Sequence, residues 1–151
     1  AFIIDVFARY IVGWKVSSSP NAQMVLDVLD QALAARQPDP KTLIHHSDRG
    51  VQYLSIKYTE RLEEAKIDPS VGSVGDSYDN AMAETINGLY KAEVIEHEGP
   101  WQGKKDVEFA TLDWVHWFNH ERRFGPIGYI APAQAERSYY DSIMPVTLAA
   151  E

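Results

Sequence analysis

Two acidic residues are the strongest candidates for chemistry in this chain of 151 residues. Asp48 lies in the run His-His-Ser-Asp-Arg-Gly and Glu84 in Tyr-Asp-Asn-Ala-Met-Ala-Glu, with 35 residues (49–83) between them. Carboxylate oxygens are the ligands that Mg²⁺ prefers, and cations held beside a phosphodiester promote transfer of its phosphoryl group. The pair therefore predicts metal-dependent phosphoryl transfer. The alternative is two solvated surface acids.

The segments around the two acids predict how they are positioned. An apolar run at 42–45 indicates a buried strand that would place the Asp48 carboxylate at its C-terminal end. Glu84 falls about one turn into a helix that Asp79 is placed to cap. Helical spacing puts Glu84, Gly88 and Lys91 on one face. The opposite, apolar face carries Met82, Ile86, Leu89 and Tyr90.

The rest of the chain alternates between strand and helix patterns. A hairpin is expected from 1–5 and 10–16, followed by a helix that is capped by Ser18 or Ser19 and ends near Gln37-Pro38. A helix at 55–65, a strand at 67–71 and a glycine-containing loop at 72–77 come next. The C-terminal part is expected to contain a helix at 104–120, a turn at 125–128 and a final helix that begins at Ala131-Pro132-Ala133. This alternation predicts an α/β or α+β layered fold. The tryptophans at 114 and 117 share the apolar stripe of the 104–120 helix, which favours a core role over base stacking.

Composition limits the possible functions. The net charge of −8 argues against a protein that coats DNA, although it allows a local DNA site. Basic residues gather at Lys104-Lys105 and Arg122-Arg123. The chain has no cysteine, which excludes disulfide scaffolds and thiolate metal centres. No signal peptide or membrane-spanning pattern is present, so we expect a cytoplasmic protein.

Other catalytic arrangements fit the residues less well. Asp5 is a possible third acid, but its place at a turn favours a capping role. His45 and His46 with Asp48 suggest zinc, yet consecutive strand residues point to opposite faces and no second His or Cys cluster follows. A serine hydrolase is disfavoured because no Gly-x-Ser-x-Gly sequence occurs.

A set of motifs in fixed order resembles one known family. They are His46-Ser47-Asp48-Arg49-Gly50, Gly75, Tyr78-Asp79-Asn80-Ala81, Glu84 and Lys91, with the hairpin at 2–14 before them and Trp117-Phe118-Asn119 and Ile127 to Pro132 after them. This set, which covers essentially the whole chain, resembles the catalytic core of bacterial insertion-sequence transposases related to retroviral integrases.

The resemblance implies a ribonuclease-H-like mixed sheet flanked by helices and an active site of three acids. Asp48 would be the second acid and Glu84 the third, together binding two Mg²⁺ ions, for which Mn²⁺ can substitute. The reaction would be 3′-end cleavage of DNA followed by strand transfer into target DNA by a homo-oligomer in a bacterial cytoplasm. The residues expected to contact DNA are Lys91, Arg49, Asn80, Arg122 and Arg123, and the loop at 72–77 is expected to become ordered on DNA.

One departure from the family pattern is important. The family's first acid lies on a strand before the one that starts this chain, and that strand would be central, between the hairpin and the Asp48 strand. We therefore expect one N-terminally truncated domain over 1–151, with the sheet and the Glu84 helix in 1–98 and C-terminal helices in 99–151. Alone, it should be inactive, and it should oligomerise through its exposed strand edges or close its sheet in a non-native way. The alternatives are a hydrolytic nuclease and a non-catalytic DNA-binding or assembly module.

Overall fold

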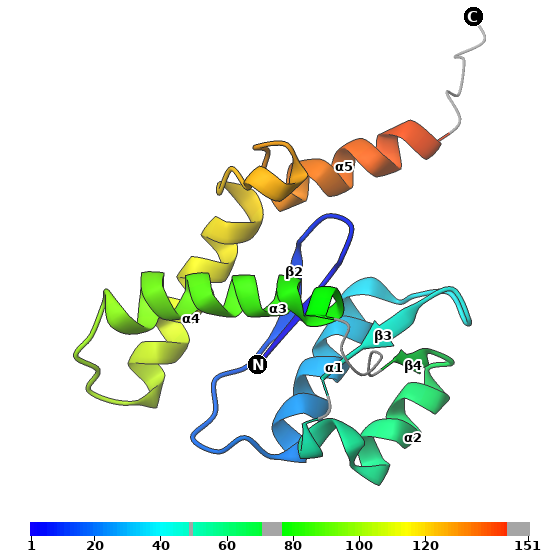
Figure 1. Ribbon diagram of the computed structural model, residues 1–151, viewed down its shortest axis with the longest axis horizontal. Coiled ribbons are helices and arrows are strands. Elements are labelled where there is room, and N and C mark those ends of the chain that lie inside the picture. The colour runs from blue at the N-terminus through cyan, green and yellow to red at the C-terminus, as the bar shows by residue number, and fades with distance from the viewer. Residues whose placement is uncertain (49, 71–76, 145–151) are drawn as a thin grey trace, which may run out of the picture.

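The computed structural model describes residues 1–48, 50–70 and 77–144 and contains two small sheets (Figure 1). Strands β1 (Phe2–Ile4) and β2 (Ile11–Trp14) pair antiparallel, as the hairpin pattern predicted. Strands β3 (Ile44–His46) and β4 (Asp68–Ser70) pair in parallel. Within the described ranges no ladder joins β1 to β3. The sheet is thus divided at the place where the family's central strand is expected.

Within the described residues, five α-helices surround these sheets. They are α1 (Ala22–Arg36), α2 (Ile56–Glu64), α3 (Ser77–Tyr90), α4 (Lys104–His120) and α5 (Pro132–Ile143), with short 3-10 helices at Val51–Leu54 and Gly125–Ile127 and a π-helical turn at Lys91–Glu96. The bounds of α4 are those predicted from the sequence. In the part of the chain that is described, no helix is both long and apolar enough to cross a membrane.

Two predicted helix caps are wrong. Helix α1 is capped by Asn21, whose side-chain oxygen accepts a hydrogen bond from the Met24 amide at 2.9 Å. The serines proposed for this role lie upstream, where the Ser17 hydroxyl and the backbone of Ser19 bond to each other. Helix α3 begins at Ser77, so Asp79 lies inside its first turn. Helix α2 begins close to the predicted position and is capped by Ser55, whose side chain accepts a hydrogen bond from the Tyr58 amide at 3.2 Å.

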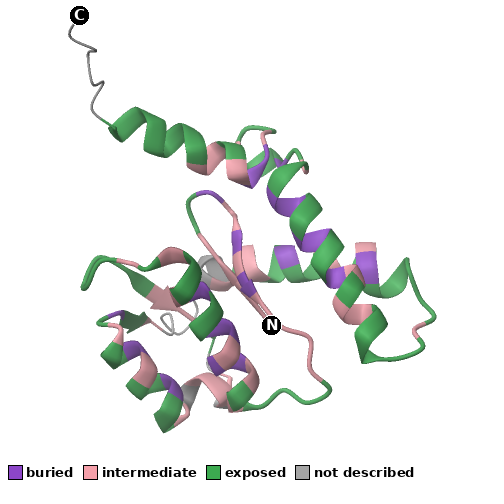
Figure 2. Ribbon diagram, turned by 180° about the vertical axis from the view of Figure 1, so that it is seen from behind, coloured by how far each residue is buried: buried purple, intermediate pink, exposed green. Residues whose placement is uncertain are grey.

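Two hydrophobic cores lie on either side of the hairpin, and the buried segments are visible in Figure 2. The first joins β2, α3 and α4 through Ile11, Ile86, Val94, Trp114, Val115 and Phe118. The second joins α1 and α2 through Val25, Leu26, Leu29, Tyr58 and Leu62, together with Ile67. Alternate residues of β1 serve the two cores: Phe2 and Ile4 pack on the first, and Ile3 packs on the second. The hairpin therefore holds the two halves of the molecule together.

The expectation that the Asp48 strand is buried is wrong. Leu43 is 45% exposed and Ile44 is 69% exposed, and neither belongs to a core cluster. The cause is that β3 has one strand partner, β4, among the described strands. The apolar run correctly located a strand, but burial depends on neighbours that a run of residues does not specify.

A buried asparagine connects α4 to the free edge of β2. Asn119, only 3% exposed, accepts a hydrogen bond from the Ile11 amide at 2.8 Å and donates one to the Ile11 carbonyl at 3.0 Å. Its amide group thus takes the place of a neighbouring strand and satisfies both backbone groups of a buried residue. Asn119 was part of the C-terminal motif, but its role follows only from the structure.

We expect Asn119→Ala to lower the free energy of unfolding by about 3 kcal/mol, because it leaves a buried N–H and a buried C=O of Ile11 unpaired. Urea denaturation at neutral pH measures this loss. The matched control is Asn87→Ala on the exposed side of α3, where the same change should cost less than about 0.5 kcal/mol. Equal losses in the two variants would show that Asn119 does not support the β2 edge.

Candidate metal and DNA site

Asp48 lies two residues beyond the end of β3, as predicted, and is exposed. Its Oδ1 accepts a hydrogen bond from the Gly50 amide at 2.7 Å, which fixes the carboxylate against the following turn. A side chain at Gly50 would be too close, since a Cβ there would lie 2.8 Å from Asp48 Oδ1. The glycine therefore allows this carboxylate position, and among the described residues Oδ2 has no hydrogen bond.

Glu84 lies on α3 and Lys91 is the first residue of the π-helical turn that follows it, and both are exposed, whereas Ile86 is buried. Among the described residues neither side chain has a hydrogen bond or ion pair. Gly88 is exposed as well, and a Cβ there would have nothing within 4 Å. The exposure of all three residues agrees with the polar face predicted from helical spacing.

A histidine connects the strand of one acid to the helix of the other. His46, the last residue of β3, places Nε2 3.0 Å from Asn80 Oδ1 on α3 and Nδ1 3.3 Å from Ser70 Oγ on β4. Asn80 lies one helical turn before Glu84. The sequence motifs contained both residues, but their contact, across 34 positions, was not foreseen.

His45 points to the other side of the strand. Its Nε2 lies 2.7 Å from the hydroxyl of Tyr58 on α2. Burial, with a smaller contribution from the neighbouring His46, lowers the pKa of His45 to about 4. The two histidines therefore cannot share one zinc ion, as the strand geometry predicted. The described residues contain no group of three or more His, Cys, Asp or Glu side chains placed to hold a metal.

The donors present fit a hard divalent cation. Asp48 and Glu84 offer exposed oxygen ligands, the type that Mg²⁺ binds. Asp5 does not join them, because its Oδ1 accepts the amides of Phe7 at 2.8 Å and Ala8 at 3.2 Å in the hairpin turn. This confirms its predicted capping role. The described residues thus supply part of a carboxylate site.

The residues expected to contact DNA differ in their surroundings. Lys91 and Arg123 are exposed and have no ion pair within the described ranges, whereas Asn80 is held by His46. Arg49 lies outside the described residues, as do positions 72–76 of the loop predicted to become ordered on DNA. The contacts of these residues with DNA stay predictions.

Arg122 has an intramolecular partner. Its Nη1 lies 2.6 Å from both carboxylate oxygens of Glu93, one of which also accepts from Trp114 Nε1 at 2.8 Å. Its guanidinium carbon lies 5.2 Å from the centre of the Trp117 ring. Only 18% of the Arg122 side chain is exposed. A DNA phosphate would therefore compete with a bound carboxylate for this guanidinium.

Comparison with solved structures defines the fold class. The catalytic core domain of an HTLV-2 integrase, solved with magnesium, superposes with a TM-score of 0.66 at 15% identity, over 87% of this chain and 80% of that one. The catalytic core domain of BIV integrase gives a TM-score of 0.67 at 18% identity, over 93% and 87% of the two chains. The chain therefore has the ribonuclease-H-like fold of retroviral integrase cores.

Sequence comparison defines the family. Two profiles described as integrase core domain match residues 1–77 and 65–132. The transposase for insertion sequence element IS629 of Shigella sonnei is 58% identical over 99% of this chain, and a putative transposase for IS986/IS6110 of Mycobacterium tuberculosis is 54% identical over 93%. The chain belongs to the integrase core domain family. It spans about half the length of these relatives, covering 50% and 52% of them.

The pKa of His45 predicts how stability depends on pH. The folded protein keeps this imidazole neutral down to about pH 4, while the unfolded chain takes up a proton near its usual pKa of 6.5. The unfolded state thus binds more protons between these values, so stability falls as pH drops from 6.5 toward 4, by at most about 3 kcal/mol.

The measurement compares urea denaturation of the parent and His45→Gln between pH 7 and pH 5. We expect the parent to lose more stability than the variant, which has no imidazole to protonate, while the carboxylates affect both alike. Parallel curves would show that His45 is not held neutral in the fold.

Proposed function

We propose that this chain is the catalytic core of a DNA transposase, a polynucleotidyl transferase that cleaves 3′ ends and joins them to target DNA. The observation that carries the proposal is the exposed face of α3 and the turn that follows it, where Glu84 and Lys91 lie two helical turns apart and neither has a hydrogen bond or ion pair among the described residues. The same helix is bonded through Asn80 to the strand that leads to Asp48. Relatives at 54–58% identity that carry the name transposase support the assignment.

Asp48 and Glu84 would hold the divalent cations, with Mg²⁺ as the expected ion and Mn²⁺ as its substitute. When bound, such ions make an attacking oxygen more nucleophilic and stabilise the charge on the leaving oxygen. The proposal draws support from the two exposed carboxylates and from the solved HTLV-2 integrase core in complex with magnesium. A third acid, expected upstream of Ala1, would complete the ligand set.

The remaining residues of the α3 face would position DNA. In the first step a water oxygen attacks the phosphorus at the transposon end and the 3′ oxygen leaves. In the second step that 3′-hydroxyl oxygen attacks a phosphorus of target DNA and displaces the neighbouring 3′ oxygen. Lys91 would neutralise a phosphate beside the acids. Gly88 would let the backbone of DNA approach the helix closely, because it carries no side chain and a Cβ there would have nothing within 4 Å.

The expected partners are transposon ends, target DNA and further copies of the chain. The HTLV-2 integrase core was solved in a trimeric and a dimeric form, which supports a homo-oligomer here. The net charge of −8 restricts the DNA-binding surface to local basic groups such as Lys91 and Arg123. Bacterial relatives support a place in the bacterial cytoplasm, where the DNA substrate is found.

The test of this function is Glu84→Gln in the chain extended upstream through the expected first strand. Manganese-dependent cleavage and joining of labelled DNA should fall by at least about 1,000-fold, because the amide cannot replace a carboxylate ligand. DNA affinity should change less than about twofold. The chain without the extension should neither cleave nor join.

The alternatives give different results in the same assay. Cleavage without joining by the extended protein would indicate a hydrolytic nuclease. Loss of DNA binding in Glu84→Gln, with no chemistry in the parent, would favour a non-catalytic DNA-binding or assembly module. Activity of the chain without its extension would mean that another acid on this chain completes the site.

Lys91→Ala tests the DNA face independently. We expect weaker DNA binding, because one phosphate contact is lost. The slope of log K against log [salt], where K is the DNA-binding constant, should become less steep by about 0.9. Metal binding should be retained. Lys105→Ala is the matched control on α4, and equal DNA affinity of the Lys91 variant and the parent would remove Lys91 from the site.

A further inference from the structure

We propose that His46 is a positioning residue, which sets the separation of the Asp48 and Glu84 carboxylates by bonding Asn80. The inference rests on the proposed metal-binding function of these acids. His46 touches neither of them, so its effect would pass through the two elements that it connects.

The contacts define one arrangement of the imidazole. With Nε2 donating to Asn80 Oδ1 at 3.0 Å, Nδ1 is left to accept from the Ser70 hydroxyl at 3.3 Å. Both ring nitrogens therefore have a hydrogen-bond partner. The ring thus bonds β3, β4 and α3 at one point.

The positions of His46 and Asn80 in the chain explain how their contact would affect the separation of the two carboxylates. One residue separates His46 from Asp48, whose carboxylate is itself fixed by the Gly50 amide at 2.7 Å. Asn80 and Glu84 lie four positions apart on α3, where side chains share a face about 6 Å apart along the axis. A shift of α3 relative to β3 would therefore move one metal ligand away from the other.

The same link contributes little to the packing of the molecule. Neither His46 nor Asn80 belongs to a core cluster, and both side chains are only half-buried. Helix α3 is anchored instead through Ile86, which is completely buried. Loss of the histidine contact should therefore affect metal affinity more than stability. Outer groups that orient metal ligands typically change affinity by 10–100-fold.

Two substitutions separate the contacts of the ring. In His46→Gln the amide N–H reaches the place of Nε2 and can still donate to Asn80. In His46→Asn the shorter side chain reaches only the place of Nδ1, so the bond to Ser70 can persist while the bond to Asn80 is lost. His45→Asn is the matched control, because His45 bonds Tyr58 on the other side of the strand.

The experiment measures Mn²⁺ affinity by electron paramagnetic resonance in the chain extended upstream through the expected first strand, with thermal unfolding of each variant recorded alongside. We expect His46→Gln to bind within about threefold of the parent and His46→Asn to bind about 10–100-fold more weakly. Asn80→Ala should match His46→Asn, and combining the two should add no further loss. His45→Asn should lower the unfolding temperature and leave Mn²⁺ affinity unchanged.

Equal affinities of His46→Asn and the parent, or equal losses in the Gln and Asn variants, would overturn the positioning role. Losses in Mn²⁺ affinity that follow the unfolding temperature, in His45→Asn as well as in His46→Asn, would also overturn it. If Mn²⁺ binding by the extended parent is absent or survives Glu84→Gln, the proposed metal site itself is wrong, and the positioning role fails with it.

Discussion

The burial of one stripe of α1 is the interaction on which the rest of the structure depends. The two sheets share no ladder in the described ranges, so hydrogen bonding does not hold them together. Val25 and Leu29 pack α1 against α2, while Val28 lies against the hairpin. Gly13 permits this close approach, because a Cβ there would lie 2.7 Å from the Val28 carbonyl oxygen. Hydrophobic burial thus replaces the missing strand pairing.

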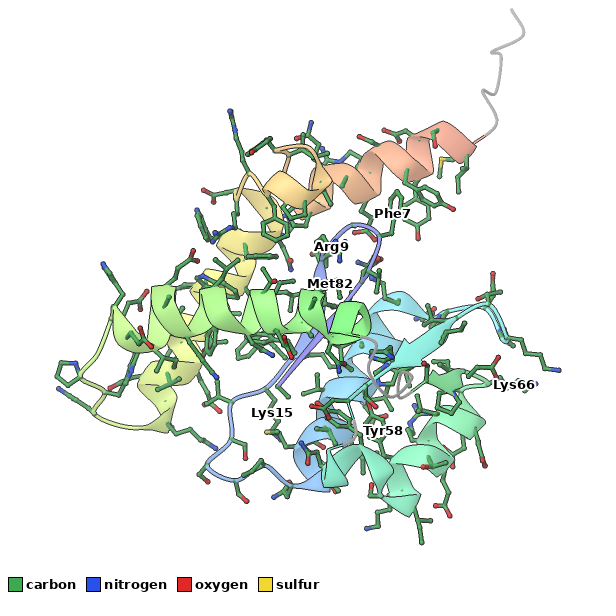
Figure 3. All side chains as sticks on the ribbon, viewed as in Figure 1. Phe7, Arg9, Lys15, Tyr58, Lys66 and Met82 are labelled. Carbon is green, nitrogen blue, oxygen red and sulfur yellow. The ribbon has the colours of Figure 1, made fainter. Side chains whose placement is uncertain are left out.

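The relative position of Asp48 and Glu84 depends indirectly on this packing of α1. Figure 3 shows α3 crossing in front of the hairpin, while Tyr58 lies among the side chains below, near α1. The hairpin therefore relates the half that carries Glu84 to the half that carries Asp48. Apolar packing fixes the relative position of the two halves only coarsely, because it is non-directional. The hydrogen bond between His46 and Asn80 is directional, and it joins residues that lie two positions before Asp48 and four positions before Glu84.

Charge is distributed in keeping with a local DNA site. Several cations are already paired within the fold, including Arg122 with Glu93 and Arg36 with Glu136. Glu84 and Lys91 differ, because neither side chain has a hydrogen bond or ion pair among the described residues. An exposed carboxylate and an exposed ammonium two helical turns apart would suit the proposed ligand, which carries both a cation and a phosphate.

The sequence by itself determined what depends on local pattern: the bounds of α4, the start of α2 close to Ser55, the hairpin, and the exposed positions of Glu84, Gly88 and Lys91. These follow from helical and strand periodicity and from capping chemistry, which act over a few residues. Only the tertiary structure decided the exposure of Ile44 and the partners of Asn119, Arg122 and His46. Those partners lie 24 to 108 positions away in the chain. A polar side chain reveals from its type that it needs a partner, but which group satisfies it depends on how distant elements pack.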